Sequence, residues 1–143
     1  MKLIISGTDG SESAERAVAV AAKLAKALNA RLLIVYVDQH EFSDKQMHLI
    51  DQYRLDLGDV LEEFGRRILA RAASVAQDHG AADVETMSGD GDPEEVLMNI
   101  AAREHADAIV VGRRDRGRLE GLLLGSVSQK LSNLAQCIVI IVP

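Results

Sequence analysis

The chain has 143 residues, of which 48% are hydrophobic and 27% charged, and this balance fits one globular domain spanning residues 1–143. A net charge of −6 and an aromatic content of only 3% exclude general nucleic-acid binding, which needs a broad basic surface or aromatic stacking platforms. The single cysteine, Cys137, excludes an internal disulfide. No stretch approaches the ~20 apolar residues of a membrane span and no leader pattern opens the chain, so we expect a cytoplasmic protein that does not bind membranes.

The first half of the chain predicts two strands and two helices. A buried strand is expected over residues 2–8, followed by a turn and a helix over residues 14–28 that Ser11 or Ser13 can cap. The nearly unbroken apolar run at residues 31–37 predicts a strand buried on both faces. The polar run from Asp38 to about Asp59 predicts a mobile connection. A second helix then ends at His79-Gly80, and its periodicity can be traced back as far as Met47.

The second half of the chain predicts three strands and two helices. Residues 83–88 suit a strand at the edge of a sheet, because polar side chains interrupt the apolar ones. A third helix is expected to begin at Pro93, with Asp92 and Glu95 arranged like a capping box. We expect a fourth strand at residues 107–111. A fourth helix follows the loop, with a capping box of Ser126 and Gln129, and a fifth strand at residues 137–142 ends the pattern.

This alternation of strands and helices predicts an α/β fold with a parallel sheet and right-handed crossovers. We expect a single-domain three-layer α/β/α sandwich, with a five-stranded parallel sheet in the order 3-2-1-4-5 and four main helices. Ligands of such sheets bind beyond the carboxyl ends of the strands, at the switch in strand order. Asp9, Val37 and Gly112 fall at those ends.

An anion site is predicted where the fourth strand leads into the fourth helix. The backbone N–H groups at a helix start are unpaired and carry the positive end of the helix dipole, so a phosphate placed there meets hydrogen-bond donors and positive charge. Capping of the helix by Ser126 alone is the competing interpretation. The preceding loop is basic although the chain is acidic, with one aspartate, Asp115, among Arg113, Arg114, Arg116 and Arg118.

The glycine spacing of this loop resembles the nucleotide-binding motif of universal stress proteins, G-x-x-G-x9-G-[S/T]. Gly112 and Gly125-Ser126 are in register with that motif, and the resemblance extends over the whole chain, through residues 8–11, 36–38, 89–93 and 140–143. The second motif glycine is replaced by Asp115, which brings a carboxylate toward the phosphates. At ~4 Å, two like charges cost on the order of 4 kcal/mol at an effective dielectric of 20, unless the flanking arginines compensate.

The resemblance implies an adenine-nucleotide pocket. Asp9 would lie by the adenine or ribose, the Val37 backbone would meet the adenine, and Gly112 would start the ribose and phosphate loop. An alternative for Asp9 is that it only turns the chain into the first helix. The phosphates would be held by backbone N–H groups and hydroxyls at the helix start, from Gly125, Ser126, Val127 and Ser128. Apart from the resemblance, the basic loop itself predicts a phosphate contact by an arginine such as Arg113, and the alternative is that these arginines only form a solvated loop.

We therefore expect a small universal stress protein that binds ATP, with or without Mg²⁺, as a sensing or regulatory ligand. No catalytic triad and no metal-ligand spacing is present, so we expect no enzyme, or at most a slow ATPase. The alternative is a nucleotide-independent dimeric interaction protein of the same family, which Asp115 favours. An adenylating enzyme is a further alternative, because Ser6-Gly-Thr-Asp-Gly-Ser11 loosely resembles a pyrophosphate loop.

The last strand predicts a homodimer. The segment from Cys137 to Val142 is too apolar to remain an open sheet edge, because such edges invite pairing with another chain. In the family the last strand typically pairs with its two-fold mate, in keeping with closed symmetric assembly. A protein partner beyond the dimer is expected, and the sequence does not identify it.

Overall fold

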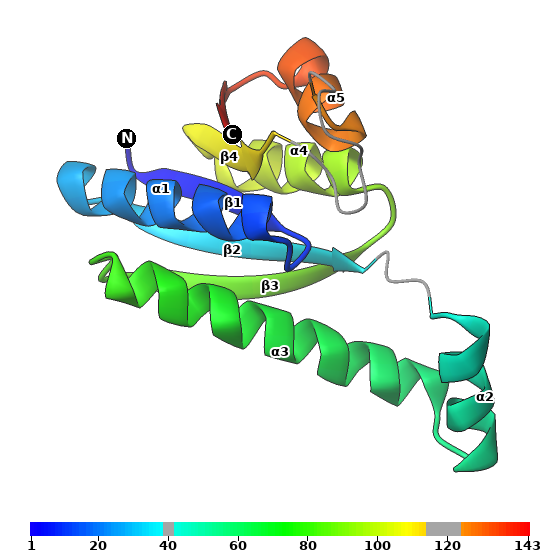
Figure 1. Cartoon of the computed structure of the whole chain (residues 1–143). Helices are drawn as coiled ribbons and strands as arrows, with labels where there is room; N and C mark the ends of the chain where they lie inside the picture. Colours follow the sequence, from blue (N-terminus) through cyan, green and yellow to red (C-terminus); the bar gives the residue numbers. More distant parts are fainter. Residues whose placement is uncertain (39–41, 114–123) are drawn as a thin grey trace.

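The computed structural model describes residues 1–38, 42–113 and 124–143 (Figure 1). Its strands form one parallel sheet in the order β3-β2-β1-β4-β5, which confirms the predicted order. The elements follow one another as β1 (Leu3–Thr8), α1 (Glu12–Leu28), β2 (Arg31–Asp38), α2 (Asp44–Gln52), α3 (Leu57–Asp78), β3 (Val84–Asp90), α4 (Pro93–Glu104), β4 (Ala108–Gly112), α5 (Ser126–Leu134) and β5 (Ile138–Val142).

The central strand β1 lies between β2 and β4, and all three end at the same edge of the sheet. The β1–β2 register runs to Thr8 opposite Tyr36, and the β4–β5 register runs to Gly112 opposite Val142. The chain leaves β1 toward β2 and leaves β4 toward β5, so the strand order switches direction between them. A crevice at the carboxyl ends is expected at such a switch point.

Two apolar clusters, one on each face of the sheet, hold the helices against it. Successive side chains of a strand point to opposite faces, so Ile4 packs under α1 and α3, whereas Leu3 and Ile5 pack under α4 and α5. Figure 1 shows the long helix α3 beside α1, with α4 on the other side of the sheet. The strands β1, β2 and β4 are buried almost throughout, as the unbroken apolar runs predicted.

The stretch after β2 corrects one expectation, because it contains a regular helix, α2. The Ser43 hydroxyl accepts a hydrogen bond from the Gln46 backbone N–H at 3.2 Å, and the Gln46 side chain accepts one from the Ser43 N–H at 2.9 Å. This capping box starts α2, and Asp56 caps α3 separately, so the described residues hold five helices rather than four. Ile50 is the only buried side chain of α2, so the apolar periodicity traced back to Met47 did not show that this helix is separate from α3.

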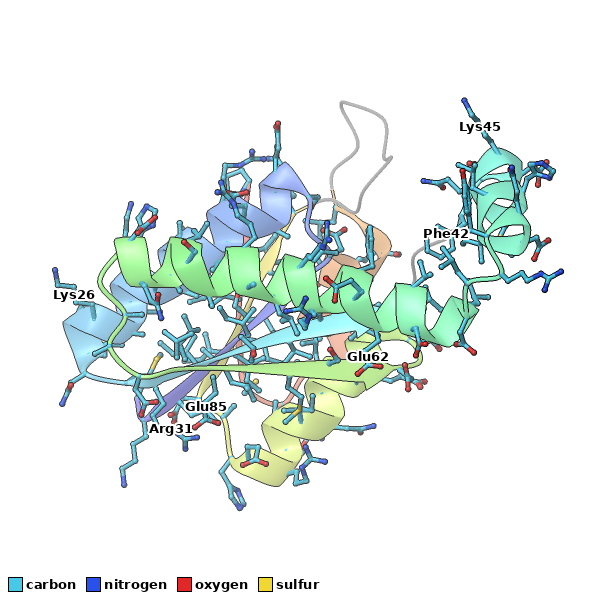
Figure 2. All side chains as sticks on the ribbon, turned by 90° about the horizontal axis from the view of Figure 1, so that it is seen from below. Lys26, Arg31, Phe42, Lys45, Glu62 and Glu85 are labelled. Atoms are coloured by element: carbon cyan, nitrogen blue, oxygen red, sulfur yellow. The ribbon has the colours of Figure 1, made fainter. Side chains whose placement is uncertain are left out.

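Helix α2 extends beyond the N-terminal end of α3, away from the sheet (Figures 1 and 2). The ring of Phe42, just before α2, packs edge-to-face on Phe64 of α3, with ring centroids 6.5 Å apart and planes at 77°. Figure 2 shows Phe42 on the side of α2 that faces α3 and Lys45 on the outer side. The aromatic pair therefore connects the segment before α2 to α3.

The helix ends follow the predictions in part. Ser11 caps α1, Asn29 ends it in the left-handed conformation at φ 52°, and Pro93 is the first residue of α4. The Asp92 side chain makes no capping hydrogen bond, so the predicted box with Glu95 is wrong. Within the described ranges, no helix combines the length and the apolar character that a membrane span requires.

Candidate functional site

The turn after β1 is held by its own side chains. The Asp9 carboxylate accepts a hydrogen bond from the Ser11 backbone N–H at 2.9 Å, and the Thr8 hydroxyl accepts one from the Gly10 N–H at 3.1 Å. The Ser11 hydroxyl in turn accepts one from the Ala14 N–H at 3.2 Å and starts α1. Asp9 is half-buried at the predicted edge of the sheet, so it lies at the expected place and also performs the turn-forming role that competed with ligand contact.

Val37 lies beside this turn, at the end of β2. Its side chain is buried in the cluster under α4 and α5, and its backbone pairs with Gly89 of β3. The pairing of β2 with β1 ends one residue earlier, at Tyr36. The Val37 backbone therefore lies one residue beyond the last pair of β1 and β2, at the carboxyl edge of the sheet. This is the position in which the adenine contact was predicted.

Gly112 is a glycine because α1 sits directly on the end of β4. A Cβ atom at this position would lie 2.9 Å from the carbonyl carbon and 3.0 Å from the carbonyl oxygen of Ser13, and closer still to the Ser13 hydroxyl. Among the described atoms, the buried Ser13 hydroxyl has no hydrogen-bond partner. This contact joins residues about a hundred positions apart, and the sequence pattern gave no signal for it.

The start of α5 corrects a further expectation. Gly125, not Ser126, is the N-cap, and Ser126 is the exposed first residue of the helix, so the predicted box of Ser126 and Gln129 is wrong. The Gly125 N–H donates to the Arg113 carbonyl oxygen at 2.6 Å, and the buried Ser128 hydroxyl donates to the same oxygen at 2.8 Å. Two donors predicted for phosphate therefore close the base of the loop instead.

These bonds fix the start of α5 to the end of β4. The Arg113 N–H donates to the Val142 carbonyl oxygen of β5 at 2.7 Å. Arg113, whose carbonyl oxygen accepts the bonds from Gly125 and Ser128, is therefore itself bonded to β5. The Arg113 Nε is buried and has no hydrogen-bond partner among the described atoms. Val127, half-buried, packs against the cluster under α4 and α5. The backbone of the first turn of α5 is thereby held in a defined position.

The start of α5 also differs in charge from the other helix starts that the structure describes. No side chain caps it and no acidic residue lies in its first turn. The four other helices each have at least one carboxylate there, from Glu12 and Glu15, Asp44, Asp59, or Glu94 and Glu95. A carboxylate at a helix start offsets the positive end of the helix dipole. In α5 no described carboxylate does so, and this is the charge arrangement that favours an anionic ligand.

One ion pair connects α5 to α4. The Lys130 ammonium donates to the Glu94 carboxylate at 2.8 Å, and Glu94 is only 7% exposed. The hydrogen bond from Lys130 lowers the pKa of Glu94, and the same bond raises the pKa of Lys130. The pair connects the first turn of α4 to the middle of α5 on one face of the sheet.

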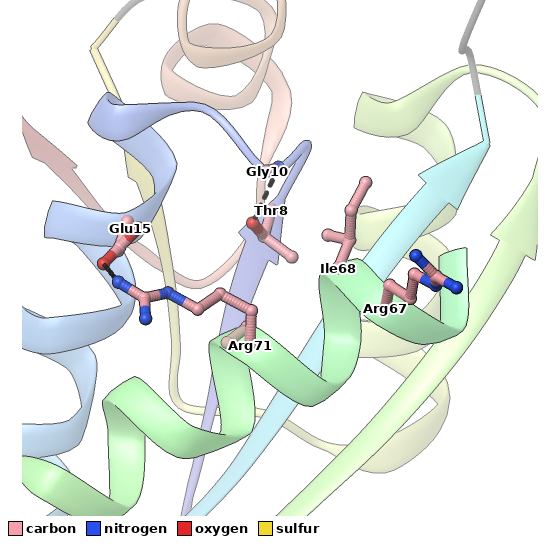
Figure 3. Close-up of a pocket in the computed structure, with 7 residues that line it drawn as sticks. Thr8, Gly10, Glu15, Arg67, Ile68 and Arg71 are labelled. Atoms are coloured by element: carbon pink, nitrogen blue, oxygen red, sulfur yellow. Dashed lines mark hydrogen bonds and ion pairs between the residues drawn. The ribbon is translucent and has the colours of Figure 1, made fainter. Parts of the chain in front are cut away.

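On the opposite face, a pocket of about 200 Å³ opens between the turn after β1 and the helix α3 (Figure 3). Figure 3 shows Ile68 directed toward the Thr8–Gly10 turn and Arg71 directed toward Glu15. Sequence reasoning missed this pocket, because the α3 residues read as a helix face and nothing in the pattern placed them beside the first turn. Its lining residues are Thr8, Gly10, Glu15, Arg67, Ile68, Arg71 and Ala72.

Asp115 and the arginines Arg114, Arg116 and Arg118 lie outside the described residues. In the described ranges, no group of three or more His, Cys, Asp or Glu side chains is arranged to hold a metal ion. Of the predicted nucleotide residues, the structure therefore brings Asp9, Val37 and Gly112 to one edge of the sheet, with the start of α5 bonded to the end of β4.

Comparison with known proteins gives consistent matches over the whole chain. The family model described as "Universal stress protein family" matches residues 1–143. The chain is 38% identical to universal stress protein Rv1636 of Mycobacterium tuberculosis, over 99% of this chain and 95% of that protein. It is 34% identical to universal stress protein YxiE of Bacillus subtilis, over 94% of this chain and 93% of that one.

Among solved structures, the fold is similar to one described as a universal stress protein in complex with cAMP. The TM-score is 0.76 and the sequence identity 32%, and the match covers 99% of this chain and 97% of the other.

Proposed function

The chain belongs to the universal stress protein family, and from this premise we propose that it binds an adenine nucleotide, with ATP as a regulatory ligand. The phosphates interact with the backbone N–H groups of the first turn of α5, and the nucleoside lies along the carboxyl edge formed by Asp9, Val37 and Gly112. We keep the cytoplasm as the expected location, and propose regulation by binding rather than catalytic turnover.

The charge at the start of α5 carries this proposal. This helix has neither a capping side chain nor an acidic residue in its first turn, and it is fixed to β4 through Arg113. A phosphate is the natural ligand of such a helix start, because it meets several N–H donors and a positive dipole at once. A similar protein of 32% identity is described as a complex with cAMP, which supports a ligand that contains both adenine and phosphate.

The hydrogen bonds at this helix start limit which groups hold the phosphates. Because the Gly125 N–H and the Ser128 hydroxyl donate to Arg113, we assign the phosphates to the backbone N–H groups of Ser126, Val127 and Ser128. Asp9 accepts a hydrogen bond from the Ser11 N–H, and we place the adenine or ribose beside it.

Isothermal titration calorimetry with ATP, in the presence and absence of Mg²⁺, tests the proposal directly. We expect saturable binding at a ratio of one nucleotide per chain, and a comparison with cAMP and AMP shows how much the polyphosphate contributes. Absence of heat with every nucleotide at millimolar concentration would refute the proposal.

Asp115 favours a second candidate function, that of a dimeric interaction protein that acts without nucleotide. Its carboxylate replaces a motif glycine in the loop that would surround the phosphates. The variant Asp115→Gly distinguishes the two functions. If the wild type binds no ATP and the variant gains binding, the nucleotide-independent function is correct. If both bind with similar affinity, Asp115 does not oppose the phosphates.

We also propose that the protein is a homodimer through β5. This strand ends the sheet in the described ranges, and Ile138 and the neighbouring Leu134 of α5 are 53% and 61% exposed. An apolar strand at a sheet edge invites pairing with a second chain. Light scattering during size-exclusion chromatography at tens of micromolar should give twice the chain mass of 15.5 kDa, and a monomer would contradict the proposal.

A further inference from the structure

Exposed apolar side chains gather where α2 meets α3. Among the described residues, eight large hydrophobic side chains are exposed, and four of them lie within residues 49–57. Tyr53 is the most exposed of the eight, at 67%, and it follows Leu49 by one helical turn, so the two side chains share one face. Apolar residues exposed singly are normal, whereas gathered ones mark an interaction surface. The four residues are Leu49, Tyr53, Leu55 and Leu57.

The backbone of this α2–α3 junction, residues 49–62, is ordered by its own hydrogen bonds. At the end of α2, the Leu55 N–H donates to the Ile50 carbonyl oxygen at 3.0 Å. The Asp56 carboxylate then accepts a hydrogen bond from the Asp59 N–H at 3.1 Å and starts α3. The apolar side chains therefore stand on a preformed surface, and a partner can bind it without first ordering the segment.

The junction lies at one end of the molecule, away from the sheet (Figure 1). Figure 2 shows Phe42, just before α2, at the opposite end from Lys26, which lies near the end of α1. In Figure 1, α2 and the C-terminal strand β5 also lie on opposite sides of the molecule. The homodimer proposed through β5 therefore does not account for the exposed apolar surface at the junction.

Negative charge surrounds these apolar side chains. Residues 49–62 carry four carboxylates and one cation, Arg54, which is a local charge of −3. Within the described part of the chain, none of the four carboxylates makes an ion pair, whereas the next residue, Glu63, pairs with both Arg66 and Arg67. The four carboxylates belong to Asp51, Asp56, Asp59 and Glu62.

This combination of apolar surface and negative charge selects among the possible occupants. A two-fold contact between two copies of the junction would place the same carboxylates against each other, and like charges repel. Nucleic acids and anionic membranes would be repelled for the same reason. Because the junction is helical and its backbone groups are paired, a partner must bind its side chains and cannot extend a sheet.

We infer that the junction binds a cationic amphipathic helix of a partner protein. Leu49 and Tyr53 contact the apolar face of that helix, and the surrounding carboxylates attract lysine or arginine side chains along its border. This attraction accelerates association and makes binding sensitive to salt. The inference uses none of the residues proposed to bind the nucleotide, so the two proposals can fail independently.

A synthetic peptide serves as the probe for this surface. It has about 18 residues, or about five helical turns, and consists of lysine and leucine with the leucines on one face. Two control peptides are needed: one of the same composition with the leucines distributed around the helix, and one with glutamate in place of lysine. Fluorescence anisotropy without nucleotide should show that the amphipathic lysine peptide binds about tenfold or more tightly than either control.

Leu28 supplies a matched control for the apolar contact. It is 42% exposed at the end of α1, and Leu49 is 43% exposed on α2. Leu49→Gln combined with Tyr53→Gln should weaken peptide binding about tenfold or more, whereas Leu28→Gln should change it by less than about twofold. Circular dichroism should show that each variant is folded, as expected for substitutions of exposed side chains.

Two exposed carboxylates elsewhere supply the control for charge. Asp51→Asn combined with Glu62→Gln should weaken peptide binding and reduce its dependence on salt concentration. Asp78→Asn combined with Glu104→Gln removes the same number of charges from the ends of α3 and α4, and should change neither.

Several results would overturn the inference. Equal affinity for the three peptides, or unchanged binding in the Leu49→Gln, Tyr53→Gln protein, would show that the junction is not the binding surface. Sedimentation velocity tests a second copy as the occupant, since an assembly larger than a dimer that disappears in the same variant would assign the junction to self-association. Binding to phosphatidylcholine vesicles that this variant loses would assign it to a membrane.

Discussion

Helices α1 and α5 both begin at the carboxyl edge of the sheet, yet their first turns are built in opposite ways. At α1, the side chains of Thr8, Asp9 and Ser11 accept hydrogen bonds from backbone N–H groups, and Glu12 and Glu15 add negative charge. At α5, the cap is a glycine and the first turn has no carboxylate. The first helix start is therefore neutralised by its own side chains, whereas no carboxylate among the described residues offsets the second, where we propose that an external anion binds.

Making α5 resemble α1 should have the largest effect. Gly125→Asp places a carboxylate at the N-cap, where Asp is a favoured residue and where φ −74° and ψ 169° suit any side chain. We expect ATP affinity to fall by about 100-fold or more, because like charges at ~4 Å cost on the order of 4 kcal/mol at an effective dielectric of 20. Calorimetric titration measures the loss.

The neutral variant Gly125→Asn is the matched control for this experiment. It supplies a capping oxygen of similar size without the charge, so its ATP affinity should fall only a few-fold. Equal losses in Gly125→Asn and Gly125→Asp would mean that the added side chain itself, and not electrostatic repulsion, interferes with binding.

Forcing α1 away from the end of β4, to which the start of α5 is bonded, should have the next largest effect, and this effect is on stability. Gly112→Ala introduces a Cβ that would lie 2.9 Å from the carbonyl carbon of Ser13, so α1 and the end of β4 must move apart. We expect the free energy of unfolding to fall by about 1–3 kcal/mol, the usual cost of overpacking. Urea denaturation measures the change, and an unchanged midpoint would show that α1 is not packed on β4 as described.

Removing the cap of α1 should have a smaller effect, and one on stability alone. Ser11→Ala deletes the hydroxyl that accepts from the Ala14 N–H, which typically costs about 1 kcal/mol of folding free energy. ATP affinity should change by less than about twofold, because the phosphates are assigned to α5. A large loss of ATP affinity in a folded Ser11→Ala protein would instead place the phosphates at α1.

The smallest expected effect concerns the ion pair beside α5. Lys130 lowers the pKa of Glu94 below its ordinary value of 4.5, so the pair stabilises the fold above that pH and its contribution is lost as the pH falls. Glu94→Gln should reduce the fall in unfolding free energy between about pH 5 and about pH 3 by less than about 1 kcal/mol.

Denaturant titrations at each pH measure this dependence. Asp107 adds a similar dependence in both proteins, because the backbone N–H groups of Lys2 and Leu3 lower the pKa of its carboxylate. A residual dependence is therefore expected in Glu94→Gln, and an identical pH profile in the two proteins would contradict the assigned ion pair.

Much of the fold could be predicted because its signals are local. The apolar runs that became β1, β2 and β4 reflect burial on both faces, and Asn29 and Pro93 mark helix ends through their own backbone preferences. Helix α2 was not recognised as separate from α3 because Ile50 is its only buried side chain, although the sequence contains the Ser43 and Gln46 capping box.

The site was predicted less completely because its contacts are distant in sequence. The motif located Gly112 and Gly125 correctly. The N-cap of α5 is Gly125 and not the predicted Ser126. The Arg113 carbonyl oxygen accepts hydrogen bonds from the Gly125 N–H and the Ser128 hydroxyl, and the sequence did not indicate either bond. No pattern could show that Gly112 contacts Ser13, or that Ile68 of α3 lies beside the turn after β1. Such contacts follow from the packing of whole helices on the sheet.

Backbone amide NMR during titration with ATP tests the central claim most directly, because it compares the two helix starts in one experiment. We expect the largest shifts in amide resonances at Ser126, Val127 and Ser128, with only small shifts at Ala14 and its neighbours in α1. Large shifts at the start of α1 with none at the start of α5, or no shifts at either helix start, would contradict it.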